Sequence, residues 1–450
     1  MSAGGVAVPG GAAARPSGRT LDQRVFATYR TELLKLSSQL AVRLLVLVCA
    51  VGPFAFTALL RVQSGTPADA LFGAYVHSSG FAVCLVVMGF AGAWGFPLIA
   101  GLMAGDQFAA EDRHNTWKTI LTRSCSLGEV FTGKLLAAAT FAMGMLLVAM
   151  LSSLLAGLIL VGGHGLVDLS GNLQSAGRSL LFTLVSWALC VLPLLAYVSL
   201  AALFSVASRN GIVGVVGPIV IALATTLIDL IGKGVWVHVL LIGSAFGGMY
   251  GLFTASPFLG PLLVTSLVSL AWIAVCIGAA WLILRRRDFL AGSSVRAPSW
   301  HAPLRVVALT TAVVAVLAVA SNLGPVGITP QRLDAAIGAT FNDASLLQQR
   351  LIGRIAPAGA KLDVQPFCNR RGAKSQGPGD WLCNVYVYLP QLKSVPFQRT
   401  NVEYDVSVRY DGCYKAQSPP TFIGGPTMTN DRGRSVVNPL FVVYGCFNVL

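Results

Sequence analysis

Seven residues, Gly128–Lys134, have the spacing of a loop that binds nucleotide phosphates. In such a loop two glycines lie five positions apart, and a lysine follows the second. The next residue here is Leu135, where the loop needs a serine or threonine to hold Mg²⁺. The motif follows no predicted strand and runs directly into an apolar stretch. We interpret it as a chance match, so this chain is not expected to hydrolyse ATP or to bind a cofactor.

The remaining reactive side chains form no catalytic pattern. The five histidines lack the spacing of metal ligands, and we assign them no catalytic or metal-binding role: His77, His114, His164, His238 and His301. Asp229 lies close to an apolar run, but Gly232 and Lys233 follow so closely that a position at the membrane surface is expected. An intramembrane enzyme would need a paired acid and base or an activated nucleophile, and the sequence offers neither.

One charge-rich segment, Asp106–Lys134, interrupts two long apolar runs. Its acidic pair, Glu111 and Asp112, is followed by Arg113 and His114, in an order compatible with a short helix. On the cytoplasmic face of a membrane protein, such a helix can enter a cleft of a soluble partner and move when the cleft closes. We therefore expect these four residues to dock a partner. The alternative is that they are solvated loop charges.

The elements that must position this segment are membrane helices. The chain is 55% hydrophobic and only 11% charged, whereas soluble domains carry about 25% charged residues. Each predicted span is long enough to cross roughly 30 Å of hydrocarbon. The predicted fold class is an all-α polytopic membrane bundle, with a six-span core at 43–289 and a seventh span at 305–321. The predicted spans are 43–61, 82–104, 132–160, 177–206, 211–231, 261–284 and 305–321.

The basic residues predict the orientation. In the short loops they gather on the side of the N-terminus, for example at Arg113, Lys118 and Arg285–Arg287, which marks that side as cytoplasmic. Most of the net charge of +14 is therefore a topology signal, and no nucleic-acid partner is expected. Residues 1–20 predict a disordered cytoplasmic tail, and 290–304 predict a cytoplasmic linker. The protein is expected in the cell membrane, in contact with lipid.

Two segments, 21–42 and 232–260, are predicted to lie at the membrane surface and not to cross it. Residues 21–42 predict an amphipathic helix in the inner interface, because Arg30, Glu32 and Lys35 would be costly in hydrocarbon. The alternative is an early start of the first span. Residues 232–260 are apolar enough to cross, but a crossing would reverse the orientation of everything that follows. We predict instead helices that enter the outer leaflet and return.

Residues 322–450 predict a small extracytoplasmic α+β domain. A helical stretch at 331–355 precedes runs of alternating apolar and polar residues that indicate half-buried strands. Four cysteines confined to this part of the chain indicate two disulfides in an oxidising compartment. Three pairings are open, of which we favour the first and second cysteine together and the third and fourth together. The cysteines are Cys368, Cys383, Cys413 and Cys446.

Several of these features together resemble one family. They are Arg30–Lys35 before the first span, then Glu111 with Thr116, Leu121 and Gly133–Lys134 after the second, and Arg286–Phe289 after the sixth. This pattern is similar to the permease subunits of ATP-binding-cassette exporters of the second export type, over about 21–289. In that family the helix before span one and the cytoplasmic helix after span two contact the ATPase. Short helices between spans five and six lie at the outer leaflet. Asn115 stands where the family often has glycine.

The resemblance implies an exporter permease. Soluble ABC-type ATPase subunits would bind the ATP, and a second permease copy or a paralogue would complete the substrate path. The apolar spans favour a lipid-like or amphipathic cargo. The alternative is a membrane-anchored envelope protein or sensor that acts through its C-terminal domain, although one span would suffice as an anchor.

Overall fold

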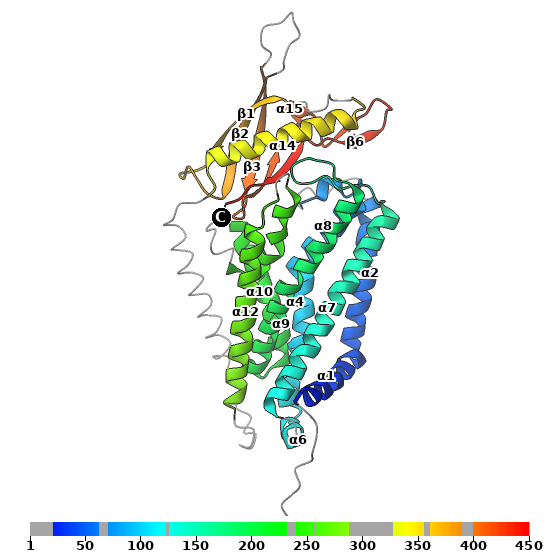
Figure 1. Ribbon diagram of the computed structural model, residues 1–450, viewed down its shortest axis with the longest axis vertical. Coiled ribbons are helices and arrows are strands. Elements are labelled where there is room, and N and C mark those ends of the chain that lie inside the picture. The colour runs from blue at the N-terminus through cyan, green and yellow to red at the C-terminus, as the bar shows by residue number, and fades with distance from the viewer. Residues whose placement is uncertain are drawn as a thin grey trace, which may run out of the picture.

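A bundle of long helices carries a small mixed domain at one end (Figure 1). The computed structural model describes residues 21–62, 71–122, 126–231, 240–254, 257–287, 327–354, 361–388 and 399–449. The predicted tail at 1–20, the linker at 290–304 and the seventh span at 305–321 lie outside these residues.

The bundle is built from apolar helices whose bounds follow the predicted spans closely. Leu40–Val62 (α2), Gly80–Arg113, Leu127–Leu160 (α7), Ala176–Ser208 and Gly260–Arg285 (α12) are long and apolar enough to cross a membrane. The fifth predicted span coincides with α10, Gly211–Ile231, whose apolar helical stretch of described side chains, Gly211–Leu227, is shorter. The described residues thus confirm a mostly helical membrane bundle.

Two of these long helices contain local irregularities. Gly80–Arg113 consists of α3 (Gly80–Phe90), a π-helical turn η2 (Ala91–Gly95), α4 (Phe96–Ala104) and α5 (Ala109–Arg113). Ala176–Ser208 consists of α8 (Ala176–Leu189) and α9 (Val191–Ser208). The π turn inserts one extra residue into the helical repeat, a device that is frequent at functional sites.

Close approach of α4 and α10 depends on glycine. A Cβ atom added at Gly105 would collide with the backbone of Gly214, and one added at Gly101 would collide with the carbonyl oxygen of Val215. Small residues at a helix interface let two backbones approach closely, which is how membrane helices gain packing contacts. The N-terminal end of α10 is therefore held against the segment that leads into α5.

The helix before the first span, α1, covers Leu21–Ser38 and ends just before α2 begins at Leu40. It packs against α7 at the end of the bundle that lies opposite the C-terminal domain (Figure 1). Leu36 and Glu32 are buried, whereas Phe26 and Leu34 are exposed. The acidic side chain of Glu32 thus faces the bundle.

Part of the region at 232–260 is described. There η3, a 3-10 helix at Gly243–Phe253, packs against α12, α8 and α10. The carbonyl oxygen of Phe253 accepts a hydrogen bond of 2.8 Å from the N–H of Leu169, in the loop between α7 and α8. At about 2 Å of rise per residue, this helix is too short to cross the hydrocarbon by itself.

The C-terminal domain is a five-stranded antiparallel sheet covered by one long helix, α14 (Pro330–Leu351). The strand order is β1-β2-β3-β4-β7. The strands are β1 (Asp363–Arg370), β2 (Gly379–Tyr388), β3 (Arg399–Val408), β4 (Cys413–Gln417) and β7 (Val442–Cys446). A short helix, α15 (Pro420–Ile423), and a hairpin of β5 (Thr427–Thr429) and β6 (Ser435–Val437) lie between β4 and β7.

The two disulfides confirm the favoured pairing. Cys368 and Cys383 are directly opposite on β1 and β2, and they are bonded. Cys413 and Cys446 are opposite on β4 and β7, and they are bonded too. Each bridge therefore joins an outer strand of the sheet to its only neighbour, which limits fraying at both edges.

The domain contacts the bundle directly. The amide of Asn172 donates a hydrogen bond of 3.0 Å to the carboxylate of Asp343 on α14. Leu347 of α14 and Tyr444 of β7 belong to the same buried apolar cluster as the bundle helices. The C-terminal domain thus continues the packing of the bundle at the end opposite α1 and α6 (Trp117–Thr122).

Candidate functional site

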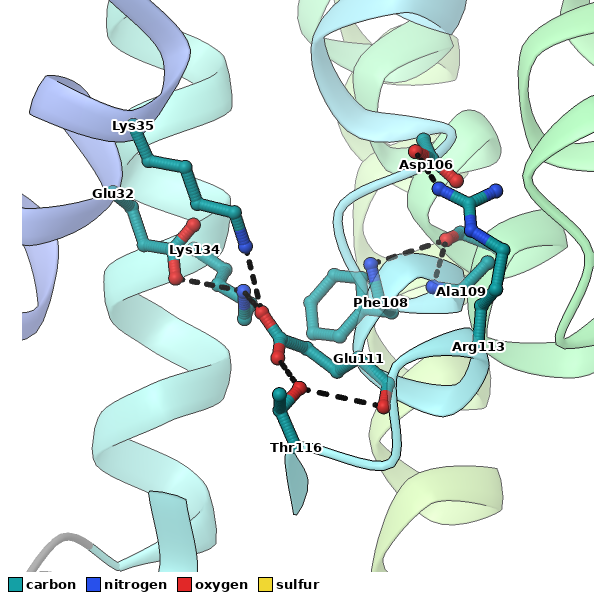
Figure 2. A network of polar contacts seen from close by, with 10 residues as sticks. Glu32, Lys35, Asp106, Phe108, Ala109, Glu111, Arg113, Thr116 and Lys134 are labelled. Atoms are coloured by element: carbon teal, nitrogen blue, oxygen red, sulfur yellow. Dashed lines mark hydrogen bonds and ion pairs between the residues drawn. The ribbon is translucent and has the colours of Figure 1, made fainter. Parts of the chain in front are cut away.

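The charge-rich segment forms a compact hairpin at the end of the bundle near α1. After α4, the chain turns into α5, reverses at Asn115 and continues into α6. The start of α5 is fixed by α9, because the Ser205 hydroxyl accepts hydrogen bonds from the backbone N–H groups of Phe108 (3.3 Å) and Ala109 (3.1 Å) (Figure 2). These are helix-terminal donors that have no partner within their own helix.

Glu111 is the centre of a buried ionic network. Its Oε1 atom lies 2.8 Å from Lys35 Nζ and 2.9 Å from Lys134 Nζ, and Lys134 Nζ also lies 2.7 Å from Glu32 Oε1 (Figure 2). Lys134 is fully buried, and Glu111 and Glu32 are 5% and 8% exposed. Buried charges are tolerated only when they are paired and hydrogen-bonded. The network therefore ties α1, α5 and α7 together.

The charge of Lys35 is supported by its neighbours. Partial burial opposes that charge, but the hydrogen bond to Glu111 and the nearby carboxylates of Glu32, Glu111 and Asp106 raise the pKa of Lys35 above its ordinary value. A raised lysine pKa means that the stabilising contribution is complete below the unfolded pKa and is lost only at strongly alkaline pH. The pair with Glu111 is thus maintained throughout the physiological range.

The turn of the hairpin explains Asn115. This residue has φ of 53°, in the left-handed region, which glycine adopts without strain and asparagine tolerates better than most residues. Its position lets Thr116 turn back onto Glu111, whose side-chain Oε2 atom accepts a hydrogen bond from the Thr116 hydroxyl (Figure 2). The backbone N–H of Thr116 donates to the Glu111 carbonyl oxygen at 3.1 Å. The departure from glycine at this position therefore preserves the turn.

Two further ion pairs hold the outside of α5. Asp112 accepts from Arg287, just beyond α12, at 2.9 Å. Arg113 donates to Asp106 at 2.9 Å, and both of these side chains are largely exposed. The hairpin is thus connected to α1, α7, α9 and the end of α12, which makes it a junction of the bundle.

The four residues expected to dock a partner therefore differ in accessibility. Glu111 faces inward, Asp112 is partly covered by its pair with Arg287, and only Arg113 and His114 are exposed. Lys118 on α6 is exposed beside them. Docking by these residues stays a prediction, and the accessible part of the hairpin is its tip.

The apparent phosphate-binding motif has structural roles instead. Ser126 and Glu129 form a reciprocal capping box at the start of α7. Gly133 lies where a Cβ atom would be 2.8 Å from Thr28 of α1. Lys134 belongs to the ionic network. Sequence reasoning noted this lysine as part of the family pattern but missed its partners, and a lone lysine inside an apolar run was the available signal.

Comparison with known proteins supports the sequence-based resemblance. Residues 28–209 match the family model described as ABC-2 family transporter protein. Over these residues the chain is similar to an ABC-2 type permease. The matched residues include the C-terminal part of α1, the hairpin and α7, and hence every member of the ionic network. A search of curated proteins found no match.

The ABC-2 permease family is a component of membrane transport and not itself the ATPase. In the described part of the chain, no group of three or more histidine, cysteine, aspartate or glutamate side chains is placed to hold a metal ion. The arrangement connects the hairpin to the bundle by ion pairs. Glu111 links it to α1 and α7, and Asp112 links it to the end of α12.

Proposed function

We propose that this chain is the membrane-spanning permease subunit of an ATP-driven ABC exporter, moved by separate ATPase subunits that dock on the hairpin tip. The observation that carries the proposal is the buried network of Glu111, Lys134, Glu32 and Lys35, because it attaches a short exposed hairpin to two long helices, α1 and α7. A hairpin attached in this way can transmit the closure of a partner cleft to the bundle. ATP would be bound and hydrolysed in the partner.

The proposed topology has the N-terminus and the hairpin in the cytoplasm and the C-terminal domain outside. The hairpin and the disulfide-bonded sheet lie at opposite ends of the bundle (Figure 1). Disulfides persist in oxidising compartments, and short loops rich in arginine and lysine stay in the cytoplasm. Both signals favour the same orientation.

A second permease copy or a paralogue would complete the transport path. One face of α10 exposes a row of large apolar side chains, Ile212, Val216, Val220, Leu223 and Leu227. These residues recur at the spacing of one helix face. Lipid would contact this face in an isolated chain, and another permease would cover it in a dimer. The apolar bundle favours a lipid-like or amphipathic cargo.

Co-purification tests this function directly. The paired substitutions His114→Glu and Lys118→Glu alter the exposed tip and leave the ionic network in place. We expect the wild-type chain, extracted in mild detergent from its native membrane, to retain a near-stoichiometric ATPase that the variant loses. Arg432→Glu, on an exposed turn of the C-terminal domain, is the matched control and should retain it.

The choice of residues separates docking from folding. Charge reversal at Glu111 and Asp112 would break pairs with Lys134 and Arg287, so a loss of partner there would have two explanations. Recovery of envelope proteins alone, bound through the C-terminal domain and unaffected by the tip variant, would refute the permease proposal and favour the anchored sensor.

A further inference from the structure

A cavity of about 170 Å³ lies where the outer half of the bundle meets the C-terminal domain. Its wall includes small residues of the π turn, hydroxyl groups of α9 and α10, and aromatic rings of η3. Representative lining residues are Gly92, Ala93, Tyr197, Thr225, Phe246 and Tyr250. The lining is thus partly apolar and partly able to donate hydrogen bonds.

One residue of the C-terminal domain, Arg409, reaches this cavity and is the charged group among the described residues that line it. Its guanidinium carbon lies 5.7 Å from the ring centre of Tyr250, within range of a cation–π contact. A Cβ atom at Gly247 would be 3.3 Å from its Nη2 atom, so glycine leaves room for the guanidinium. Asp411 lies 3.4 Å from the same nitrogen and helps to orient it.

The cavity is open beside Gly89. A Cβ atom added at this position would meet no atom within 4 Å. The neighbouring Phe90 and Trp94 are about half exposed, at 48% and 49%. The opening therefore adjoins an apolar surface of the bundle, while Arg409 lies on the side of the C-terminal domain.

The size of the cavity restricts its ligand. Sites that enclose a drug-sized molecule usually measure about 300–1,000 Å³, so this cavity suits one part of a larger molecule. A guanidinium favours phosphate and carboxylate groups because its N–H donors match their oxygen atoms. Apolar chains of the same molecule could remain outside, against the exposed aromatic surface.

We propose that this cavity binds the phosphate-bearing head of an anionic membrane amphiphile. Arg409 contacts the phosphate oxygens, and the acyl chains leave past Gly89 along Phe90 and Trp94. Free phosphate shares the head-group chemistry but makes no use of the apolar surface. The inference goes beyond the proposed function, because binding here requires neither an ATPase nor transport.

The test is a lipid titration of the purified full-length chain, followed by native mass spectrometry. Short-chain phosphatidylglycerol is compared with phosphatidylcholine of the same chain length and with inorganic phosphate. Arg409→Gln should weaken binding of phosphatidylglycerol about tenfold, the usual order for one charge-assisted hydrogen bond. The control Arg371→Gln changes another exposed arginine of the same domain and should leave the affinity unchanged.

A second variant keeps the test decisive if Arg409→Gln perturbs the domain. Gly89→Leu should narrow the opening, because a Cβ atom there meets no other atom within 4 Å. It should lower the affinity for phosphatidylglycerol by a similar factor. Gly144→Leu is its control, since a Cβ atom added there also meets nothing within 4 Å.

Three results would overturn the proposal: equal losses for Arg409→Gln and Arg371→Gln, equal binding of the two lipids, or binding unaffected by Gly89→Leu. Displacement of the lipid by millimolar inorganic phosphate would instead identify a site for free anions and would overturn the proposal that the ligand is an amphiphile. Retention of the ATPase in the same preparations is measured separately, so the two proposals can fail independently.

Discussion

Removal of the buried lysine of the ionic network should destabilise the bundle in a way that depends on Glu32. In Lys134→Met the carboxylates of Glu32 and Glu111 lose the ammonium group that they share. Their Oε1 atoms are no more than about 5.6 Å apart, because both lie against Lys134 Nζ, at 2.7 and 2.9 Å. At an effective dielectric constant near 20, two charges at this separation repel by about 3 kcal/mol.

This value lies at the lower end of the range for breaking a buried ion pair, about 3–5 kcal/mol. The lower end is expected here because Lys35 still compensates Glu111. Glu32→Gln in the Lys134→Met background removes the repulsion, so the double variant should recover at least half of the lost stability. The effects of the two substitutions should therefore be strongly non-additive, as for residues in one network.

The assay uses thiols that the fold conceals. Cys49, Cys84, Cys190 and Cys276 are free and buried, so a fluorogenic maleimide reports unfolding during a thermal ramp in detergent. Lys134→Met should lower the midpoint by several degrees, and Glu32→Gln should raise it again in that background. Additive shifts would refute the argument that these charges form one network, as would a Lys134→Met midpoint within the range of an exposed control, Lys118→Met.

Three other variants test the geometry of the hairpin and the outer domain. Asn115→Gly should keep the unfolding midpoint, whereas Asn115→Val should cost about 1–2 kcal/mol, because a β-branched residue resists positive φ. Gly133→Val should loosen α1 from α7 through its clash with Thr28, and faster proteolysis of the N-terminal segment would reveal this. Replacing Cys413 and Cys446 by serine should cost the outer domain about 2–5 kcal/mol, measured as increased protease sensitivity of that domain alone.

The membrane helices could be predicted from the sequence because their signal is local. A run of apolar residues of the right length specifies a span regardless of what it contacts, and α2, α7 and α12 begin and end within a few residues of the predicted bounds. The disulfide pairing could be predicted from the sequence for a similar reason. Cysteines confined to one segment of alternating strands have few possible partners, and pairs on neighbouring strands are the simplest solution.

The contacts of the hairpin could not be predicted in this way. Glu111, Lys134 and Glu32 are far apart in the chain, and nothing in their local sequence says that one lysine will lie between two carboxylates. From the sequence alone, the charged residues of such a segment are expected to lie in solvent, because most charged side chains in proteins are exposed. The burial of Glu111 becomes evident only when α1 is seen to pack against α7.

The π turn and the role of Arg409 also could not be predicted from the sequence. An extra residue in a helical repeat has no compositional signature comparable to proline, and Ala91–Gly95 reads as ordinary helix. Arg409 belongs to a strand-forming run of a separate domain, so only the docking of that domain onto the bundle brings it to Tyr250. Both features depend on long-range packing, which periodicity does not encode.

The two candidate sites share one structural element. Gly89 borders the cavity that Arg409 lines, Glu111 lies in the ionic network, and both belong to the helical segment Gly80–Arg113. At 1.5 Å per residue they are separated by about 33 Å along this path. A head group bound beside the π turn and an ATPase docked on the hairpin would therefore act on the same helical segment. Coupling between them would require differential affinity for two positions of that helix, so a lipid that binds equally well with and without the ATPase would occupy the cavity without regulating transport.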